Sequence, residues 1–417
     1  NLFCTNEDLF TQTIVVPYLI PMLQNAGAIV FTPRERDWQT NEIVIDNDDA
    51  VKSVYYFEKE AGKRWKNCDS LGFANRYRLK DGENPFRMGT VRQAKATKRK
   101  KTSQVSYQPR FKEAGKYAVY VSYQSLPKSV SDARYIVYHK GEATEFSVNQ
   151  RMGGGTWVYL GTFDFDMGCN EFNRVVCTNK ASRRGVVTTD AVRFGGGMGN
   201  IERGGYTSGL PRCLEGARYY AQWAGAPYKV YGGRKGENDY ADDINTRSLM
   251  TNWLGGGSVY MPAKNGKHVP IELSLALHSD AGYNKDGKST FGSLAICTTD
   301  YNDGILNSGI SRFTSKDFAR ALRDNLVTDL TAQFGEFGKR YLWDRNYSET
   351  RLPEVPSAIL EMLSHQNFPD MRIAQDPLGK FYIARSIYKT ILRFVNSNHG
   401  TRYVVQPLAP QNFSVTQ

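Results

Sequence analysis

The sequence lacks the features of a membrane protein and of a small disulfide-rich protein. Its longest uncharged apolar run near the start, residues 14–23, contains two prolines. A helix that spans a bilayer needs roughly 20 apolar residues, so we predict no membrane span. The 417 residues include six cysteines and no Cys-x-x-Cys pair, which excludes a dense disulfide framework and a zinc ribbon. Cys169 and Cys177 could pair in an exported protein or remain two buried thiols.

Acidic residues are in the minority. Lys and Arg outnumber Asp and Glu by 54 to 42, for a net charge of +12. Such a surplus favours anionic partners, such as nucleic acid, acidic polysaccharide, cell wall or anionic lipid. The densest basic cluster is Lys95–Lys101, which no helix-turn-helix, zinc-finger or ribonucleoprotein signature accompanies. We therefore predict that this cluster is a solvated loop and that nucleic acid is not a partner.

The chain opens with a helical pattern. Apolar residues recur at helical spacing from Glu7 to Leu23, Asn6 is in position to cap the helix, and Gly27 ends it. The two prolines inside this stretch predict a kinked or broken helix. The apolar residues 28–31 then predict a short buried strand.

A strand-rich region follows and then gives way to helices. Between residues 50 and 200, β-branched and aromatic runs separated by Gly-containing turns predict an antiparallel sandwich. The predicted strands are 116–123, 133–138, 144–148, 156–160 and 186–194. After residue 205 we predict helices at 212–224, 239–254, 315–334 and 379–397, with strands at 271–277, 291–298 and 356–361.

These patterns predict an α/β fold interrupted by a β-sandwich. Residues 1–45 and 205–400 would form one three-layer α/β domain, and residues 46–204 would be an insertion in one of its loops. Insertions of this kind are tolerated where both ends of the inserted domain lie close together at a surface loop. Residues 401–417 read as a linker and the start of another strand.

Three segments carry candidate residues for catalysis or metal binding. His278 and Asp280 follow a buried strand, at the sheet edge where open α/β folds bind ligands. His278 could bind zinc or be a strand-end histidine satisfied by the backbone. Glu361 ends a second apolar strand and could be a general base or the partner of an arginine. Glu7, in the first helical turn, could be a ligand or could stabilise the helix dipole.

Together these residues resemble the zinc-dependent N-acetylmuramoyl-L-alanine amidases of the type-3 fold. The matching motifs are the Glu7 helix, Val30–Asp37, Arg247 and Asn252 five apart on a helix, Ala276-Leu-His278-Ser-Asp280-Ala, and Pro356–Glu361. The resemblance implies an amidase-like α/β domain. It implies Glu7 and His278 as zinc ligands, Glu361 as the catalytic general base and acid, and Asp280, Arg247 and Asn252 as substrate-binding residues.

Two further features bear on that resemblance. The family's first zinc ligand is a histidine that precedes the Glu7 helix, and no residue of this chain matches it. Because the chain opens at Asn1 rather than at a methionine, we expect it to be a processed or trimmed product. Arg247 could clamp a peptide carboxylate or could pair with a carboxylate of its own helix.

The inserted region resembles a golvesin C-terminal-like β-sandwich. Its cues include Trp65, Gly115–Val121, Gly155–Phe163 and Thr189–Phe194. An amidase-like domain with such an insert is similar to secreted bacterial proteins often labelled xanthan lyase. The tail from Pro407 resembles the first strand of a fibronectin type III module. Exposed aromatic residues such as Trp65 would then be candidates for stacking on sugars, whereas Trp157, in mid-strand, is better placed for core packing.

The resemblance implies a hydrolase that is secreted, periplasmic or on the cell surface. It would cleave the amide between N-acetylmuramic acid and the stem peptide with zinc-activated water, and its partner would be peptidoglycan or an anionic polysaccharide. Two alternatives stay open. One is a polysaccharide lyase of the xanthan type, and the other is a catalytically inactive glycan- or wall-binding protein on an amidase scaffold.

Overall fold

The computed structural model describes residues 5–49 and 52–408. The chain divides into two compact units: unit 1 is Asn1–Phe31 with Glu272–Gln417, and unit 2 is Thr32–Ile271. Helices and mixed strands build unit 1 and mainly antiparallel sheets build unit 2, which confirms the predicted α/β class with a β-sandwich. Within the described ranges, no helix combines the length and apolar character needed to cross a bilayer.

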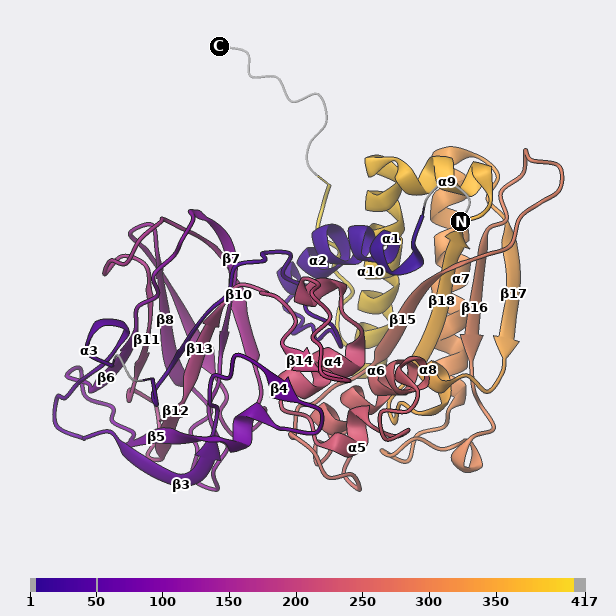
Figure 1. Cartoon of the computed structure of the whole chain (residues 1–417). Helices are drawn as coiled ribbons and strands as arrows, with labels where there is room; N and C mark the ends of the chain where they lie inside the picture. The colour runs from indigo at the N-terminus through magenta and orange to yellow at the C-terminus, as the bar shows by residue number, and fades with distance from the viewer. Residues whose placement is uncertain (1–4, 50–51, 409–417) are drawn as a thin grey trace, which may run out of the picture. The chain divides into compact units, whose positions relative to one another are not determined.

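A four-stranded sheet forms the centre of unit 1 (Figure 1, brown to yellow). Its order is β15 (Ser274–Asp280), β18 (Ser357–Ser364), β16 (Ser293–Cys297) and β17 (Lys339–Asp344). β15 runs parallel to β18, whereas β16 runs antiparallel to β18 and parallel to β17. Three of these strands were predicted from their apolar runs, and β17 was not.

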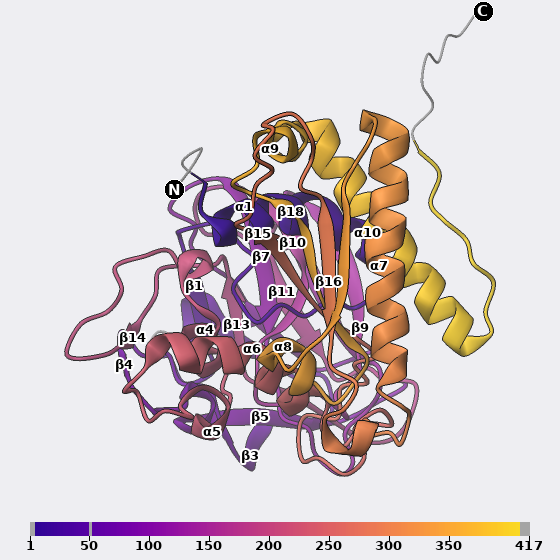
Figure 2. The same cartoon turned by 90° about the vertical axis from the view of Figure 1, so that its right-hand side faces the viewer.

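Two long helices cover one face of this sheet. They are α7 (Phe313–Phe334) and α10 (Pro377–His399), and Figure 2 shows α7 running along β16. Side chains alternate across a strand, so Leu360 of β18 packs in the core with Phe318 and Leu322 of α7, whereas Ile359 lies in a separate small cluster. Unit 1 also contains the short helices η5 (Asn302–Gly304), α8 (Ser348–Arg351) and α9 (Phe368–Gln375).

The first helix is interrupted, as predicted. It consists of α1 (Glu7–Ile14), a π-helical turn η2 (Val15–Leu19) and α2 (Ile20–Asn25). Asn6 caps it, because its side chain accepts a hydrogen bond from the amide of Leu9 at 3.2 Å. Pro17 lies within the π turn. Because proline has no backbone N–H to donate to the preceding turn, it interrupts the regular α-helical hydrogen bonds at this point.

The strand predicted at residues 28–31 is wrong. These residues have no regular secondary structure, and the side chain of Ile29 is 76% exposed. A run of four apolar residues predicts burial only if a neighbouring strand is there to pair with it, and in the described part of the chain none pairs with this segment.

Unit 2 contains the predicted antiparallel sandwich. One sheet has the order β1 (Ile43–Asp46), β13 (Ala191–Phe194), β7 (Gly115–Val121), β10 (Val158–Phe165). The second has the order β2 (Tyr56–Lys59), β6 (Gln104–Tyr107), β11 (Arg174–Thr178), β8 (Ala133–His139), β9 (Glu142–Val148). A third small sheet is β12 (Val186–Thr189), β5 (Gly89–Lys95), β3 (Lys66–Gly72), and β4 (Leu79–Lys80) pairs with β14 (Ile201–Glu202). The helices of this unit are α3 (Lys52–Tyr55), η3 (Pro85–Arg87), η4 (Arg212–Leu214), α4 (Ala217–Trp223), α5 (Tyr228–Tyr231) and α6 (Asp239–Gly255).

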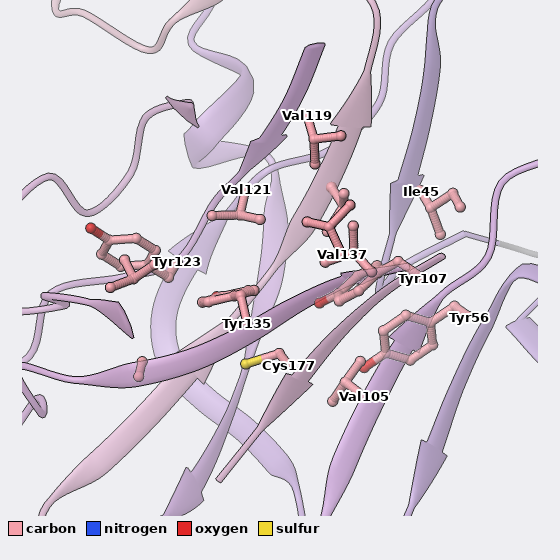
Figure 3. Close-up of a cluster of buried hydrophobic side chains, with 14 of the residues drawn as sticks. Ile45, Tyr56, Val105, Tyr107, Val119, Val121, Tyr123, Tyr135, Val137 and Cys177 are labelled. Atoms are coloured by element: carbon pink, nitrogen blue, oxygen red, sulfur yellow. The ribbon is translucent and has the colours of Figure 1, made fainter. Parts of the chain in front are cut away.

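The strand β7 is buried on both faces. Val119 and Val121 pack into the sandwich core, which Figure 3 shows with Tyr135 and Cys177. Tyr120 points the other way, into a second core that contains Trp223 of α4. This second core explains why the compact unit continues to Ile271, whereas the predicted domain boundaries at 45/46 and 204/205 remain predictions.

Other expectations can be compared with the structure. Trp65 and Trp157 are both buried, so Trp65 is not available for stacking and that expectation was wrong. Cys169 and Cys177 are separate free thiols, which rules out the disulfide alternative. Lys98–Lys101 are exposed outside regular strands and helices, as expected of a solvated loop. The fibronectin-like strand was predicted for a tail of which residues 409–417 lie outside the described residues.

Candidate active site

His278 and Glu361 lie side by side on neighbouring parallel strands. The register of β15 and β18 places His278 directly opposite Glu361. Leu275 and Leu277 of β15 face the helix-covered core, while Ala276 packs with Ile359 on the opposite side of the sheet. Because strand side chains alternate, His278 and Glu361 share this opposite side with Ala276 and Ile359.

Glu7 reaches the same place from the first turn of α1. Its Oε1 atom lies 2.8 Å from Nδ1 of His278 and accepts a hydrogen bond from the amide of Ser279 at 3.1 Å. The two side chains are 271 positions apart in the sequence. The cap at Asn6 fixes the start of the helix and therefore the position from which Glu7 projects. The structure thus brings Glu7, His278 and Glu361 together, as the amidase resemblance implied.

Glu349 is a fourth member of the cluster that sequence reasoning missed. It comes from α8, the short helix before β18, and its Oε2 atom lies 3.0 Å from Nε2 of His278. Both ring nitrogens of His278 therefore face a carboxylate. No periodicity or motif marks Glu349, since a four-residue helix has none. Its position just before β18 along the chain is the only signal that could have suggested it.

The four side chains perturb one another. Burial opposes the positive charge on His278, but hydrogen bonds to Glu349 and Glu7 outweigh it and raise the pKa of His278 to about 10. Burial would raise the pKa of Glu7, but the hydrogen bond and charge of His278 lower it on balance. Burial, with the charges of Asp280 and Glu7, raises the pKa of Glu361 to about 7 although His278 opposes this.

Glu361 has the properties of a proton-transfer group. Its Oε2 atom is buried and has no hydrogen-bond partner among residues 5–49 and 52–408. A buried carboxylate oxygen without a partner is costly, and a general base normally has a pKa near the working pH. The position therefore suits a carboxyl that exchanges protons with a bound water or substrate.

Asp280 is engaged by an arginine rather than left open. Its carboxylate pairs with Arg340 of β17 and accepts a hydrogen bond from the amide of Ala281 at 2.6 Å. The guanidinium of Arg340 also lies 3.9 Å from the centre of the Phe291 ring. His365, a loop residue after β18, donates from Nδ1 to the carbonyl oxygen of Ser279 at 2.9 Å. This contact gives His365 a structural partner at the end of β15.

Arg247 and Asn252 belong to unit 2. Both lie on α6, where Nη2 of Arg247 is 3.0 Å from Oδ2 of Asp243, four residues earlier on the same helix. This pair corresponds to the structural alternative for Arg247. The carbonyl oxygen of Asn252 accepts a hydrogen bond from the amide of Gly256 at 2.8 Å. Substrate binding by Arg247, Asn252 and Asp280 remains a prediction.

The described side chains around His278 include some, but not all, of the donors that a catalytic zinc ion needs. Glu7 and His278 are suitable zinc ligands, and Glu349 holds the second ring nitrogen of His278 as carboxylates often do for metal-bound histidines. A catalytic zinc takes three protein ligands and a water. Among the described residues, no group of three or more His, Cys, Asp or Glu side chains is arranged to hold a metal ion. These residues by themselves therefore do not fit a resident catalytic zinc.

Comparison with known proteins identifies part of unit 2. Residues 80–196 match the Golvesin C-terminal domain family, which confirms the golvesin-like resemblance for that segment. A curated relative named xanthan lyase, from Bacillus sp. (strain GL1), is 34% identical over 97 residues. That match covers 23% of this chain and 10% of the relative, so the chain spans about a tenth of that protein's length.

Several solved structures are similar to parts of the chain. A Paenibacillus xanthan lyase matches 37% of this chain and 13% of its own, at 21% identity and a TM-score of 0.29. The N-acetylmuramoyl-L-alanine amidase of Clostridium difficile 630 matches 40% of this chain and 79% of its own, at 14% identity and a TM-score of 0.26. The corresponding amidase of Mycobacterium smegmatis matches 42% and 79%, at 19% identity and a TM-score of 0.27. These similarities are too low to carry an argument about function.

Proposed function

We propose that unit 1 is the hydrolytic unit of a cell-wall amidase. Its substrate would be the amide between N-acetylmuramic acid and the first residue of the stem peptide. One observation carries the proposal: Glu7 and His278 are in contact at 2.8 Å, and Glu361 is opposite His278 in the register of β15 and β18. The amidase resemblance assigns its key roles to these same three residues.

Glu361 has the proton-transfer role in this proposal. A carboxylate at this position would accept a proton from the attacking water and return it to the leaving amine. Its buried and unpartnered Oε2 atom supports the role, because a substrate water would supply the missing hydrogen bond. Glu7 and His278 are proposed as two ligands of a zinc site that the described residues do not complete. An enzyme acting on this substrate would be secreted, periplasmic or on the cell surface.

A substitution at Glu361 tests the proposal. The assay follows free amine released from purified peptidoglycan by the whole chain, with zinc in the buffer. Glu361→Gln keeps the size of the side chain and removes the base, so we expect turnover to fall by about a hundredfold or more. The matched control is Glu336→Gln, an exposed glutamate of the same unit, which should retain full activity. Equal turnover in Glu361→Gln and wild type would remove Glu361 from its role.

The second candidate function is non-catalytic binding to glycan or cell wall. The observation that favours it is the incomplete donor set, since the described residues supply two zinc ligands where catalysis needs three. Co-sedimentation of the wild-type chain with peptidoglycan, without release of amine, would support binding and contradict the amidase proposal. Release of unsaturated uronate, measured by its near-ultraviolet absorbance, would instead favour the lyase alternative.

A further inference from the structure

An exposed basic segment of unit 2 leads into β4 and includes its two residues. Its sequence is Arg76-Tyr77-Arg78-Leu79-Lys80, and within it only Leu79 is buried. The side chain of Tyr77 is 89% exposed, and the guanidinium of Arg78 lies 5.7 Å from the centre of its ring. The basic residues Arg76, Arg78 and Lys80 alternate with Tyr77 and Leu79, and the chain bends at Tyr77.

These alternate residues line a groove. It has a volume of about 460 Å³, and its lining consists of three cations, two carboxylates and a thioether: Arg76, Arg78, Lys80, Glu83, Met88 and Glu202. Parallel pairing of β4 with β14 brings Lys80 next to Glu202 in the register. The turn that follows Glu202 carries Tyr206, whose side chain is 80% exposed. The groove therefore joins two chain segments that are distant in sequence, and each segment also carries an exposed tyrosine outside the residues that line the groove.

The positive charges of the groove are only partly neutralised. Arg78 is 3.8 Å from Glu202, which is a long ion pair between partly exposed groups. Glu83 accepts a hydrogen bond from the backbone amide of Lys80 at 2.8 Å, so this carboxylate is engaged by the main chain. Within the described part of the chain, neither Arg76 nor Lys80 has an ion-pair partner. The groove thus has cations in excess, available to an anionic ligand.

We propose that this groove binds an acidic polysaccharide of the uronate type. A uronate ring has one carboxylate, which the guanidinium of Arg76 or Arg78 would bind through paired hydrogen bonds. Its hydroxyl groups would donate to Glu202, and its apolar face would stack on an exposed tyrosine ring such as that of Tyr77. The combination of cations, carboxylate acceptors and aromatic rings matches the mixed chemistry of such a sugar.

The two carboxylates of the groove argue against nucleic acid as the occupant. A nucleic-acid strand has one phosphate per nucleotide, so Glu83 and Glu202 would stand beside a densely charged backbone and repel it. A uronate polymer that alternates charged and uncharged sugars, or a short uronate oligomer, can place hydroxyls there instead. The proposal is independent of the amide hydrolysis proposed for unit 1, since the groove residues all belong to unit 2.

The test measures binding of a hyaluronate oligosaccharide, in which uronates alternate with uncharged amino sugars (N-acetylglucosamine), to the whole chain by titration calorimetry. The methyl-esterified form of the same oligomer is the ligand control, because it keeps the sugar rings and loses the charge. The double variant Arg76→Ala with Lys80→Ala removes two groove cations, and both side chains are exposed, so the fold should be unaffected. Its matched control is Arg99→Ala with Lys100→Ala, which removes two exposed cations from the loop between β5 and β6.

We expect the groove variant to bind the acidic oligomer about tenfold or more weakly, because it has lost two cations that would form charge-assisted hydrogen bonds with the uronate carboxylates. The loop variant should bind like the wild type, and the esterified oligomer should bind weakly to every variant. Equal losses of affinity in both double variants would show that only the net charge of the protein matters, and the groove would then not be the binding site. Single-stranded DNA of matched charge that binds more tightly than the oligomer would overturn the glycan assignment.

Discussion

A pair of buried carboxyl groups in unit 2 makes the stability of the protein depend on pH. Asp46 ends β1, and Asp190 lies between β12 and β13, next to the residue that pairs with Asp46. Both side chains are buried, and no ion pair neutralises either within the described residues. Burial and then the charges of Asp190, Asp48 and Asp49 raise the pKa of Asp46 to about 9. Burial raises the pKa of Asp190 to about 8, against hydrogen bonds from Phe73 and Ser122.

These shifts determine the sign of the pH dependence. An aspartate in the unfolded chain has a pKa of about 3.9, so between pH 4 and pH 8 the folded state holds a proton at Asp190 that the unfolded state has released. The contribution of Asp190 to stability is then fully present below pH 4 and is lost as the pH rises toward 8. Each such proton contributes a slope of about 1.4 kcal/mol per pH unit.

The substitution Asp190→Asn removes one of these protons. Asparagine keeps an oxygen that can accept the hydrogen bond from the amide of Phe73, which is now 2.9 Å from Oδ2 of Asp190. The free energy of unfolding of the variant, relative to that of wild type, should therefore be about 3 kcal/mol more favourable at pH 7 than at pH 5. This figure is the slope of one proton taken over two pH units.

Urea unfolding of both proteins at pH 5, 6 and 7 checks this prediction through the free energy of unfolding of unit 2. The control is Asp166→Asn, which removes an exposed carboxylate from the same unit and so matches the change in net charge. If the stability difference between Asp190→Asn and wild type is the same at pH 5 and pH 7, then Asp190 is not protonated in the folded protein and the reasoning fails.

Two further predictions concern the cluster in unit 1. His278→Ala should weaken zinc binding by the whole chain about a hundredfold or more, measured by competition with a chromophoric chelator, because the proposed site loses a direct ligand; unchanged zinc affinity would refute the ligand assignment. Glu349→Leu should weaken zinc binding by roughly 10–100-fold while Glu349→Gln, which can still accept from Nε2 of His278, retains most of it. Equal affinities in these two variants would show that Glu349 does not position the imidazole.

The sequence predicts the centre of unit 1 well because the relevant signals are local. The apolar runs of β15 and β18 mark both strands, and polar residues at their carboxyl ends must meet at one edge if the strands are parallel neighbours. The contact of Glu7 with His278 was implied by the amidase resemblance alone, because the helix cap at Asn6 fixes where the helix begins and not what its first turn contacts. The position of Glu7 in the cluster therefore could not be worked out from local pattern.

The features that the sequence did not predict depend on tertiary contacts. Glu349 projects from a helix too short to have a period, and β17, with the sequence Lys-Arg-Tyr-Leu-Trp-Asp, has too few apolar residues to resemble a buried strand. The helical pattern of α6 is visible in the sequence, but periodicity does not say which sheet a helix covers. Tyr120 and Trp223 share a core only because β7 is buried on both faces, and no local pattern reveals that.

The two proposals assign different physical tasks to the two units. A groove that binds a polymer raises its local concentration and lowers the apparent KM, but it adds nothing to the stabilisation of a transition state that it does not touch. Glu361 contributes only to the chemical step. The groove cations should therefore matter for a long anionic polymer and not for a small soluble amide, whereas Glu361 should matter equally for both. If substitutions in the groove and at Glu361 reduced turnover of both substrates to the same extent, the assignment of binding to unit 2 and chemistry to unit 1 would be wrong.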